Sequence, residues 1–151
     1  MKPLLQICTM KSFAFIITAT LLTASTCTRQ QIEAGFAQTM IGRWEFKSSM
    51  GGYAGKRIEA ETGKKLVLEF KPNQEFQKTL NDSVTEKGTY ELVKVKSIYT
   101  GKTDNAIRFN AATAAAPESS RLDKIIALKG DSLSISDNFY DGFQSVYTRL
   151  K

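Results

Sequence analysis

The chain has 151 residues, of which 42% are hydrophobic and 24% charged, as in a single globular domain rather than a disordered chain. Its 21 lysines and arginines exceed its 15 aspartates and glutamates, which gives a formal net charge of +6. The sequence contains no histidine, so it lacks the most common general base and the most common metal ligand.

The N-terminal segment has the pattern of an export signal. An apolar run over residues 13–22 follows Lys11 and precedes several small residues, which is the order of regions in a secretory signal peptide. The run is shorter than the roughly 20 apolar residues that a membrane-spanning helix needs. We therefore expect residues 1–26 to be a removable signal peptide. Met10, directly before Lys11, is a second candidate start residue beside Met1.

Cys27 lies at the end of this signal. Residues 21–27 resemble a lipobox, the motif in which a bacterial lipoprotein is acylated on its cysteine and cleaved just before it. Thr26 stands where that motif usually has glycine, alanine or serine, and the alternative is ordinary cleavage after Ser25. We expect lipidation of Cys27, because it leaves no unpaired thiol in an oxidising compartment.

The predicted location is the bacterial cell envelope. The lipid anchor would hold the protein at a membrane, which we expect to be the outer membrane, with the domain facing the periplasm or the cell surface. Cleavage before Cys27 lowers the formal charge from +6 to +4, because Lys2 and Lys11 are removed. This modest charge argues against a nucleic-acid partner, whose binding proteins usually carry a dense basic stripe. A polar tether over residues 27–39 is expected to precede one folded domain, residues 40–151.

The folded domain has the pattern of consecutive short β-strands. Over residues 41–48, Trp44 and Phe46 alternate with charged residues, which indicates a half-buried strand. Residues 65–71 and 75–80 flank a Pro-Asn turn and predict a hairpin. Further strands are predicted over residues 84–95, 106–110, 124–129, 132–136 and 143–150.

About eight such strands, with no helical period between them, predict an all-β domain. The favoured architecture is a small up-and-down antiparallel β-barrel, and a sandwich is the alternative. Gly88, inside the longest strand, predicts a bulge or bend. Residues 50–64 are glycine-rich around Tyr53 and predict a mobile loop. Residues 110–123 predict either a surface loop or a lid over the barrel mouth.

The first and the last predicted strands resemble those of the lipocalin family. Gly42-Arg43-Trp44 resembles the Gly-x-Trp signature of the first strand, and Tyr147-Thr148-Arg149 places an arginine on the last strand. In that family the tryptophan packs at the closed end, and an arginine or lysine of the last strand lies across its ring. The resemblance implies that Arg149 stacks on Trp44, a cation–π contact worth ~0.5–2 kcal/mol, and that the first and last strands close the barrel.

The region after residue 40 is also similar to the small lipocalin-like domains of bacterial lipoproteins, which have calycin-type barrels. The segments that carry this similarity are residues 51–55, 68–76, 88–90 and 136–143. The resemblance implies a protein that binds a small hydrophobic or amphipathic ligand at the open end of the barrel, without a cofactor.

An eight-stranded barrel either holds one small ligand or is filled by its own side chains. The residues predicted to face inward are therefore candidates for plain core packing as well: Trp44, Phe46, Leu68, Phe70, Phe76, Tyr90, Phe109, Ile135, Phe143 and Tyr147. Three aromatic residues on or beside loops are the predicted ligand contacts, because loops carry function more often than cores do: Tyr53, Phe139 and Tyr140.

No pattern of a catalytic or metal site is present in the sequence. Residues 137–142 superficially resemble a calcium loop but lack its acidic spacing and terminal glutamate, so a tight turn at Asp141-Gly142 is expected. The glycine cluster over residues 51–55 lacks the Lys-Ser or Lys-Thr pair of a phosphate loop. We expect a protein that is not an enzyme. The alternative to ligand binding is an interaction or structural module that docks another envelope protein through a strand edge or the 110–123 loop.

Overall fold

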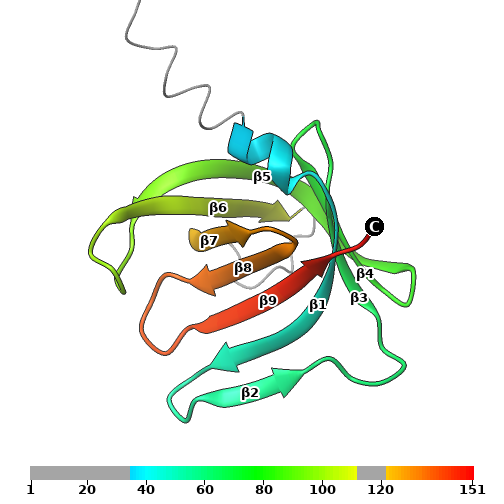
Figure 1. Ribbon diagram of the computed structural model, residues 1–151, viewed down its shortest axis with the longest axis horizontal. Helices are drawn as coiled ribbons and strands as arrows, with labels where there is room; N and C mark the ends of the chain where they lie inside the picture. The colour runs from blue at the N-terminus through cyan, green and yellow to red at the C-terminus, as the bar shows by residue number, and fades with distance from the viewer. Residues whose placement is uncertain (1–34, 112–121) are drawn as a thin grey trace, which may run out of the picture.

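The computed structural model describes residues 35–111 and 122–151. A short helix, seen over residues 35–40, is followed within these ranges by nine strands joined in one antiparallel sheet (Figure 1). The strands are β1 (Gly42–Gly51), β2 (Lys56–Glu59), β3 (Leu66–Phe70), β4 (Glu75–Leu80), β5 (Ser83–Lys96), β6 (Thr103–Ala111), β7 (Lys124–Lys129), β8 (Ser132–Asp137) and β9 (Phe143–Arg149). The predicted signal peptide, Cys27 and the first part of the predicted tether lie outside the described residues.

Eight of these strands form a closed barrel, and β2 is an additional strand outside the ring. The order is β1-β3-β4-β5-β6-β7-β8-β9, and β9 pairs back to β1. One edge of β1 pairs with β9, while its other edge pairs first with β3 and then, from Ser48 to Gly51, with β2. The predicted all-β, up-and-down antiparallel barrel is therefore confirmed, and the sandwich is excluded.

The predicted loop over residues 50–64 was wrong in part, because it contains β2. This strand escaped the sequence pattern because Ile58 is its only apolar residue and all four of its residues are exposed. Nothing in the alternation of hydrophobic and polar residues therefore marked it. Its pairing with β1 is a hairpin that the glycine-rich turn permits.

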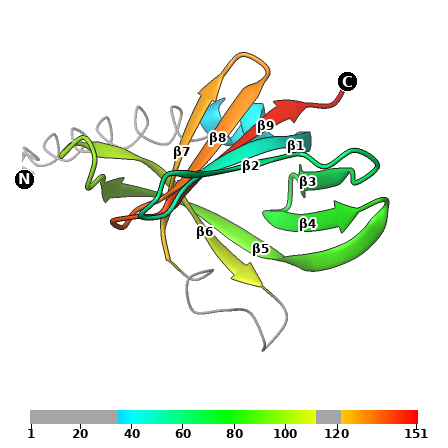
Figure 2. The same cartoon turned by 90° about the horizontal axis from the view of Figure 1, so that it is seen from below.

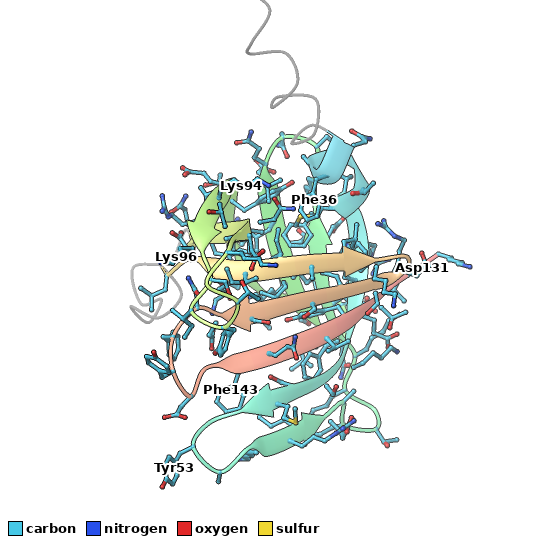
Figure 3. All side chains as sticks on the ribbon, turned by 60° about the vertical axis from the view of Figure 1, so that its left-hand side comes forward. Phe36, Tyr53, Lys94, Lys96, Asp131 and Phe143 are labelled. Carbon is cyan, nitrogen blue, oxygen red and sulfur yellow. The ribbon has the colours of Figure 1, made fainter. Side chains whose placement is uncertain are left out.

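The helix that ends at Met40 covers one end of the barrel, where the end of a tether was expected. Met40 is fully buried, and Phe36, one helical turn earlier, packs against the same core (Figure 3). The indole nitrogen of Trp44 donates a hydrogen bond of 2.8 Å to the carbonyl oxygen of Met40. The helix therefore both covers the base of the barrel and satisfies the polar atom of its largest buried side chain.

Aromatic side chains fill the barrel interior next to this base. The ring of Phe70 packs edge-to-face on Tyr90 at 5.0 Å between centroids, and Phe76 packs in the same way on Phe109 at 4.8 Å. Such geometry matches the positive ring edge of one residue to the negative face of the other. These four predicted inward residues therefore pack against one another in the barrel interior.

Arg149 joins the last strand to the first. Its guanidinium carbon lies 4.1 Å from the ring centroid of Trp44, its cross-strand partner, which is the contact that the resemblance implied. Its two terminal nitrogens donate to the carbonyl oxygens of Ile41, at 2.9 Å, and of Thr39. Gly42 has a φ of 129°, and a Cβ there would lie 3.0 Å from the guanidinium, so the arrangement requires glycine.

We predict that Arg149→Ala lowers the free energy of unfolding by about 2–3 kcal/mol, because the stack and two charged hydrogen bonds are lost together. Arg149→Lys keeps the charge but not the planar fork, so it restores only part of the loss. Urea unfolding measures both. The matched control is Arg43→Ala, an exposed arginine of β1, which should change stability by less than ~0.5 kcal/mol. Equal effects of the two alanine variants would contradict the assignment.

Gly88 marks a close approach of two strands rather than the predicted bulge. It pairs in continuous register with Phe76 on β4 and Ala111 on β6, and the irregularity of the β4–β5 pairing lies between Lys78 and Thr79. A Cβ at residue 88 would lie 2.1 Å from the backbone oxygen of Asn110. Backbone atoms cannot yield as a flexible side chain can, so any side chain here would push β5 away from β6.

We predict that Gly88→Ala lowers the free energy of unfolding by at least ~2 kcal/mol, because the added methyl group collides with the backbone of β6. The control is Thr89→Ala, at the exposed neighbouring position of the same strand. Thermal unfolding followed by circular dichroism compares the two variants. A Gly88→Ala variant as stable as the parent would show that the two strands are not this close.

Candidate functional site

A cavity of about 200 Å³ occupies the barrel interior on the far side of the aromatic core. Every strand of the ring except β1 contributes inward side chains to its wall, which consists of Leu68, Lys78, Glu86, Phe109, Lys124, Ile135, Asp137, Phe143, Ser145 and Tyr147. Strand β9 runs from one end of the barrel to the other. It begins at Phe143 in the cavity wall and ends at Arg149, which lies over Trp44. We call this cavity the lumen site.

The first of two ion pairs in the lumen site joins β4 to β5. Lys78 and Glu86 are cross-strand partners, and the Nζ of Lys78 lies 2.7 Å from the Oε2 of Glu86. The same nitrogen lies 5.5 Å from the ring centroid of Phe109 and 5.9 Å from that of Phe76. The ammonium group of Lys78 is thus held between a carboxylate and two aromatic rings.

The second ion pair joins β7 to β8 on the other side of the lumen site. Lys124 and Asp137 are cross-strand partners whose charged groups are in contact, and their side chains are only 21% and 14% exposed. The second carboxylate oxygen of Asp137 accepts a 2.9 Å hydrogen bond from the backbone N–H of Phe143. Partial burial of two charges costs less when they are paired and hydrogen-bonded, as these are.

Behind the hydroxyl of Ser145, which lines the lumen site, lies a second, buried hydroxyl, that of Ser49 on β1. The hydroxyl oxygens of Ser49 and Ser145 lie 3.1 Å apart across the β1–β9 pairing. Tyr147 is 8% exposed, and its ring packs edge-to-face on Phe46 at 5.7 Å. Burial raises the pKa of Tyr147 to about 12, so the phenol is neutral at physiological pH. The lumen site thus combines charged, hydroxyl and aromatic surfaces within one small space.

The three loop aromatics predicted as ligand contacts lie outside this wall. Tyr53 and Tyr140 are 96% and 84% exposed, and Figure 3 shows Tyr53 at the tip of the β1–β2 turn. Phe139 is exposed at the β8–β9 turn, where its carbonyl oxygen accepts a 2.9 Å hydrogen bond from the hydroxyl of Tyr99. Phe143, which was predicted to face inward, does line the lumen site.

Sequence reasoning missed the four charged residues of the lumen site. One signal was present, because Lys78 follows Phe76 by two residues and so shares its face of β4. The same alternation places Lys124 on the face of Ile126 and Asp137 on the face of Ile135. A charged residue on the apolar face of a predicted strand is therefore the pattern that could have identified this site.

A second hollow, of about 370 Å³, lies outside the barrel beneath the tip of the β5–β6 hairpin. Tyr99 and Thr100 of the tip form one wall, and Ile125 and Ala127 of β7 contribute to the floor. Asn138 fixes the tip, because its side chain donates to the carbonyl oxygen of Lys96 and accepts from the N–H of Ile98, both at 3.0 Å. Figure 2 shows this hairpin extending well beyond the rest of the barrel.

Within residues 35–111 and 122–151, no cluster of three or more side chains suited to metal binding occurs. In the same residues, no helix has the length and apolarity needed to cross a membrane. Comparisons with protein-family models, with curated proteins and with solved structures found no match.

The raised pKa of Tyr147 predicts how the free energy of unfolding depends on pH. The unfolded tyrosine ionises near pH 10, whereas the folded protein keeps the proton until about pH 12, so stability falls as pH rises through this interval. The slope from this one group reaches at most ~1.4 kcal/mol per pH unit. Tyr147→Phe should remove that component, while lysine deprotonation remains in both proteins. Urea unfolding at pH 9, 10 and 11 tests this, and parallel curves for the two proteins would refute it.

Proposed function

We propose that this protein is a lipid-anchored bacterial envelope protein whose lipocalin-like barrel binds a small amphipathic molecule at the open end of its lumen. The observation that carries the proposal is the lumen site, where two inward-facing ion pairs, Lys78–Glu86 and Lys124–Asp137, lie beside aromatic and hydroxyl side chains. The predicted signal peptide and Cys27 supply the envelope location.

The charges support recognition of a polar group. Replacing buried ion pairs by apolar side chains of similar volume is often neutral or stabilising, so stability alone gives little reason to keep two partly buried pairs inside one small barrel. The ammonium groups of Lys78 and Lys124 can donate to an anionic ligand group, and the carboxylates of Glu86 and Asp137 can accept from a cationic one. The ring of Phe109 offers an apolar surface next to these groups.

The volume limits the size of the ligand. At ~30 Å³ per water molecule, 200 Å³ corresponds to roughly seven waters, which is below the ~300–1,000 Å³ of pockets for drug-sized ligands. This favours a single ring or a short branched chain that carries a charged group. A long acyl chain, as a wide lipocalin cavity would hold, does not fit.

The position of the predicted anchor relative to the barrel would leave the lumen site accessible to ligands. An anchor ahead of residue 35 would reach the barrel at the end covered by the helix, which packs on Trp44. The lumen site lies at the opposite end of β9. Such an anchor would leave the mouth turned away from the membrane and open to solutes.

NMR titration with benzoate, benzylammonium and toluene tests the proposal. We expect the two charged probes to shift the backbone amides of Phe143 and Ser145 saturably, and toluene to bind more weakly because it cannot engage the ion pairs. Ser145→Leu fills the cavity and should weaken binding at least tenfold, about 1.4 kcal/mol. Thr148→Leu, at an exposed position of the same strand, should bind as the parent does. Binding that Ser145→Leu leaves unchanged, or no saturable shift with any probe, would refute the proposal.

A further inference from the structure

Strand β2 presents an unpaired edge at the margin of the molecule. It pairs with β1 on one side, and no strand of residues 35–111 and 122–151 lies along its other side (Figure 1). All four of its residues are exposed, and Ile58 is 41% exposed. An edge strand of this kind carries backbone groups that can pair with another chain. Strand β2 is short and charged, which restricts its partners, but it has neither a proline nor a bulge to block pairing.

The register identifies which backbone groups are free. The N–H of Ala60 donates to the carbonyl oxygen of Lys47 at 2.9 Å, so this pair is one of the hydrogen-bonded pairs of the β1–β2 ladder. Because hydrogen-bonded and non-hydrogen-bonded pairs alternate, Ile58 also bonds to β1. Arg57 and Glu59 therefore direct their N–H and C=O groups toward the open edge.

These two residues make the edge complementary to itself. In an antiparallel pair centred on Ile58, Arg57 lies opposite Glu59 of the partner subunit, and Glu59 lies opposite Arg57 of the partner subunit. Both are residues whose backbone groups are free, so the same register satisfies four backbone hydrogen bonds and two cross-strand charge pairs. The side chains of Arg57 and Glu59 already share one face of β2, where they form an ion pair. On the other face, Ile58 meets Ile58 of the partner subunit.

We propose that β2 pairs with β2 of a second copy of this chain to form a symmetric dimer. The two barrels would then share one continuous sheet across the dimer axis, running from β9 and β1 through both β2 strands. The contact is isologous, so it uses the open edge of β2 on both subunits and stops at two copies. Four residues on each side cover far less than the ~800 Å² per partner of a standard interface, so the dimer is weak and depends on concentration.

Sedimentation velocity of the parent protein from about 10 µM to about 1 mM tests this proposal. We expect the fraction of dimer to rise across this range. Arg57→Glu places two glutamates opposite each other at both charge pairs and should weaken dimerisation at least tenfold. Lys64→Glu is the matched control, because Lys64 is an equally exposed cation with its own acidic neighbour, Glu61, outside β2. It should dimerise as the parent does.

Mixing two variants tests the register itself. Glu59→Arg, like Arg57→Glu, sets like charges opposite each other in its own dimer, so neither variant should dimerise alone. In a mixed dimer each glutamate of one variant faces an arginine of the other, so an equimolar mixture should recover the dimer. A parent protein that is monomeric throughout the concentration range would overturn the proposal. A dimer that Arg57→Glu does not weaken, or a mixture that remains monomeric, would overturn it as well.

Discussion

The barrel depends on the seam where β9 returns to β1. In the part of the chain that the structure describes, β1 alone has three partner strands, because it pairs with β9 on one edge and with β3 and then β2 on the other. Arg149 reinforces this seam by covering Trp44 and by bonding the chain just before β1. The same few residues thus close the ring and hold the helix that covers the base. The absence of a side chain at Gly42 is what allows the guanidinium to come so close.

An irregularity in the seam also shapes the lumen site. The β1–β9 register shifts between Phe46 and Ser48, which adds one residue to β1. Inward alternation is thereby displaced, so that Ser49 faces Ser145 inside the barrel. The base of the interior is filled by buried aromatic side chains, whereas the open end carries hydroxyls and ion pairs. This gradient suits a ligand with an apolar and a charged part, and it is the reason for preferring a binding function over a solely structural one.

The way in which the ring closes leaves one open strand edge outside it, that of β2. A closed barrel has no free edges along its paired strands, and this protects β-proteins from unwanted pairing. Here β3 is short and pairs with β1 only up to Glu45, so the second half of β1 needs another neighbour, which β2 supplies. The edge is thereby moved outward to β2. The proposed dimer and the proposed ligand site lie on different parts of the molecule and stand on separate observations.

The amino-acid sequence by itself determined the strands of the ring and most of the aromatic core, and its resemblance to the lipocalin signature implied the contact between Arg149 and Trp44. Local alternation and a short motif can both be recognised without knowing which strands pair with each other. The tertiary structure alone decided that Lys78 and Lys124 meet Glu86 and Asp137 inside the barrel, that residues 56–59 join the sheet, and that Phe36 and Met40 pack on its base. Each of these depends on strand register and on packing between distant segments, because a side chain's environment is set by the neighbours that the fold brings to it.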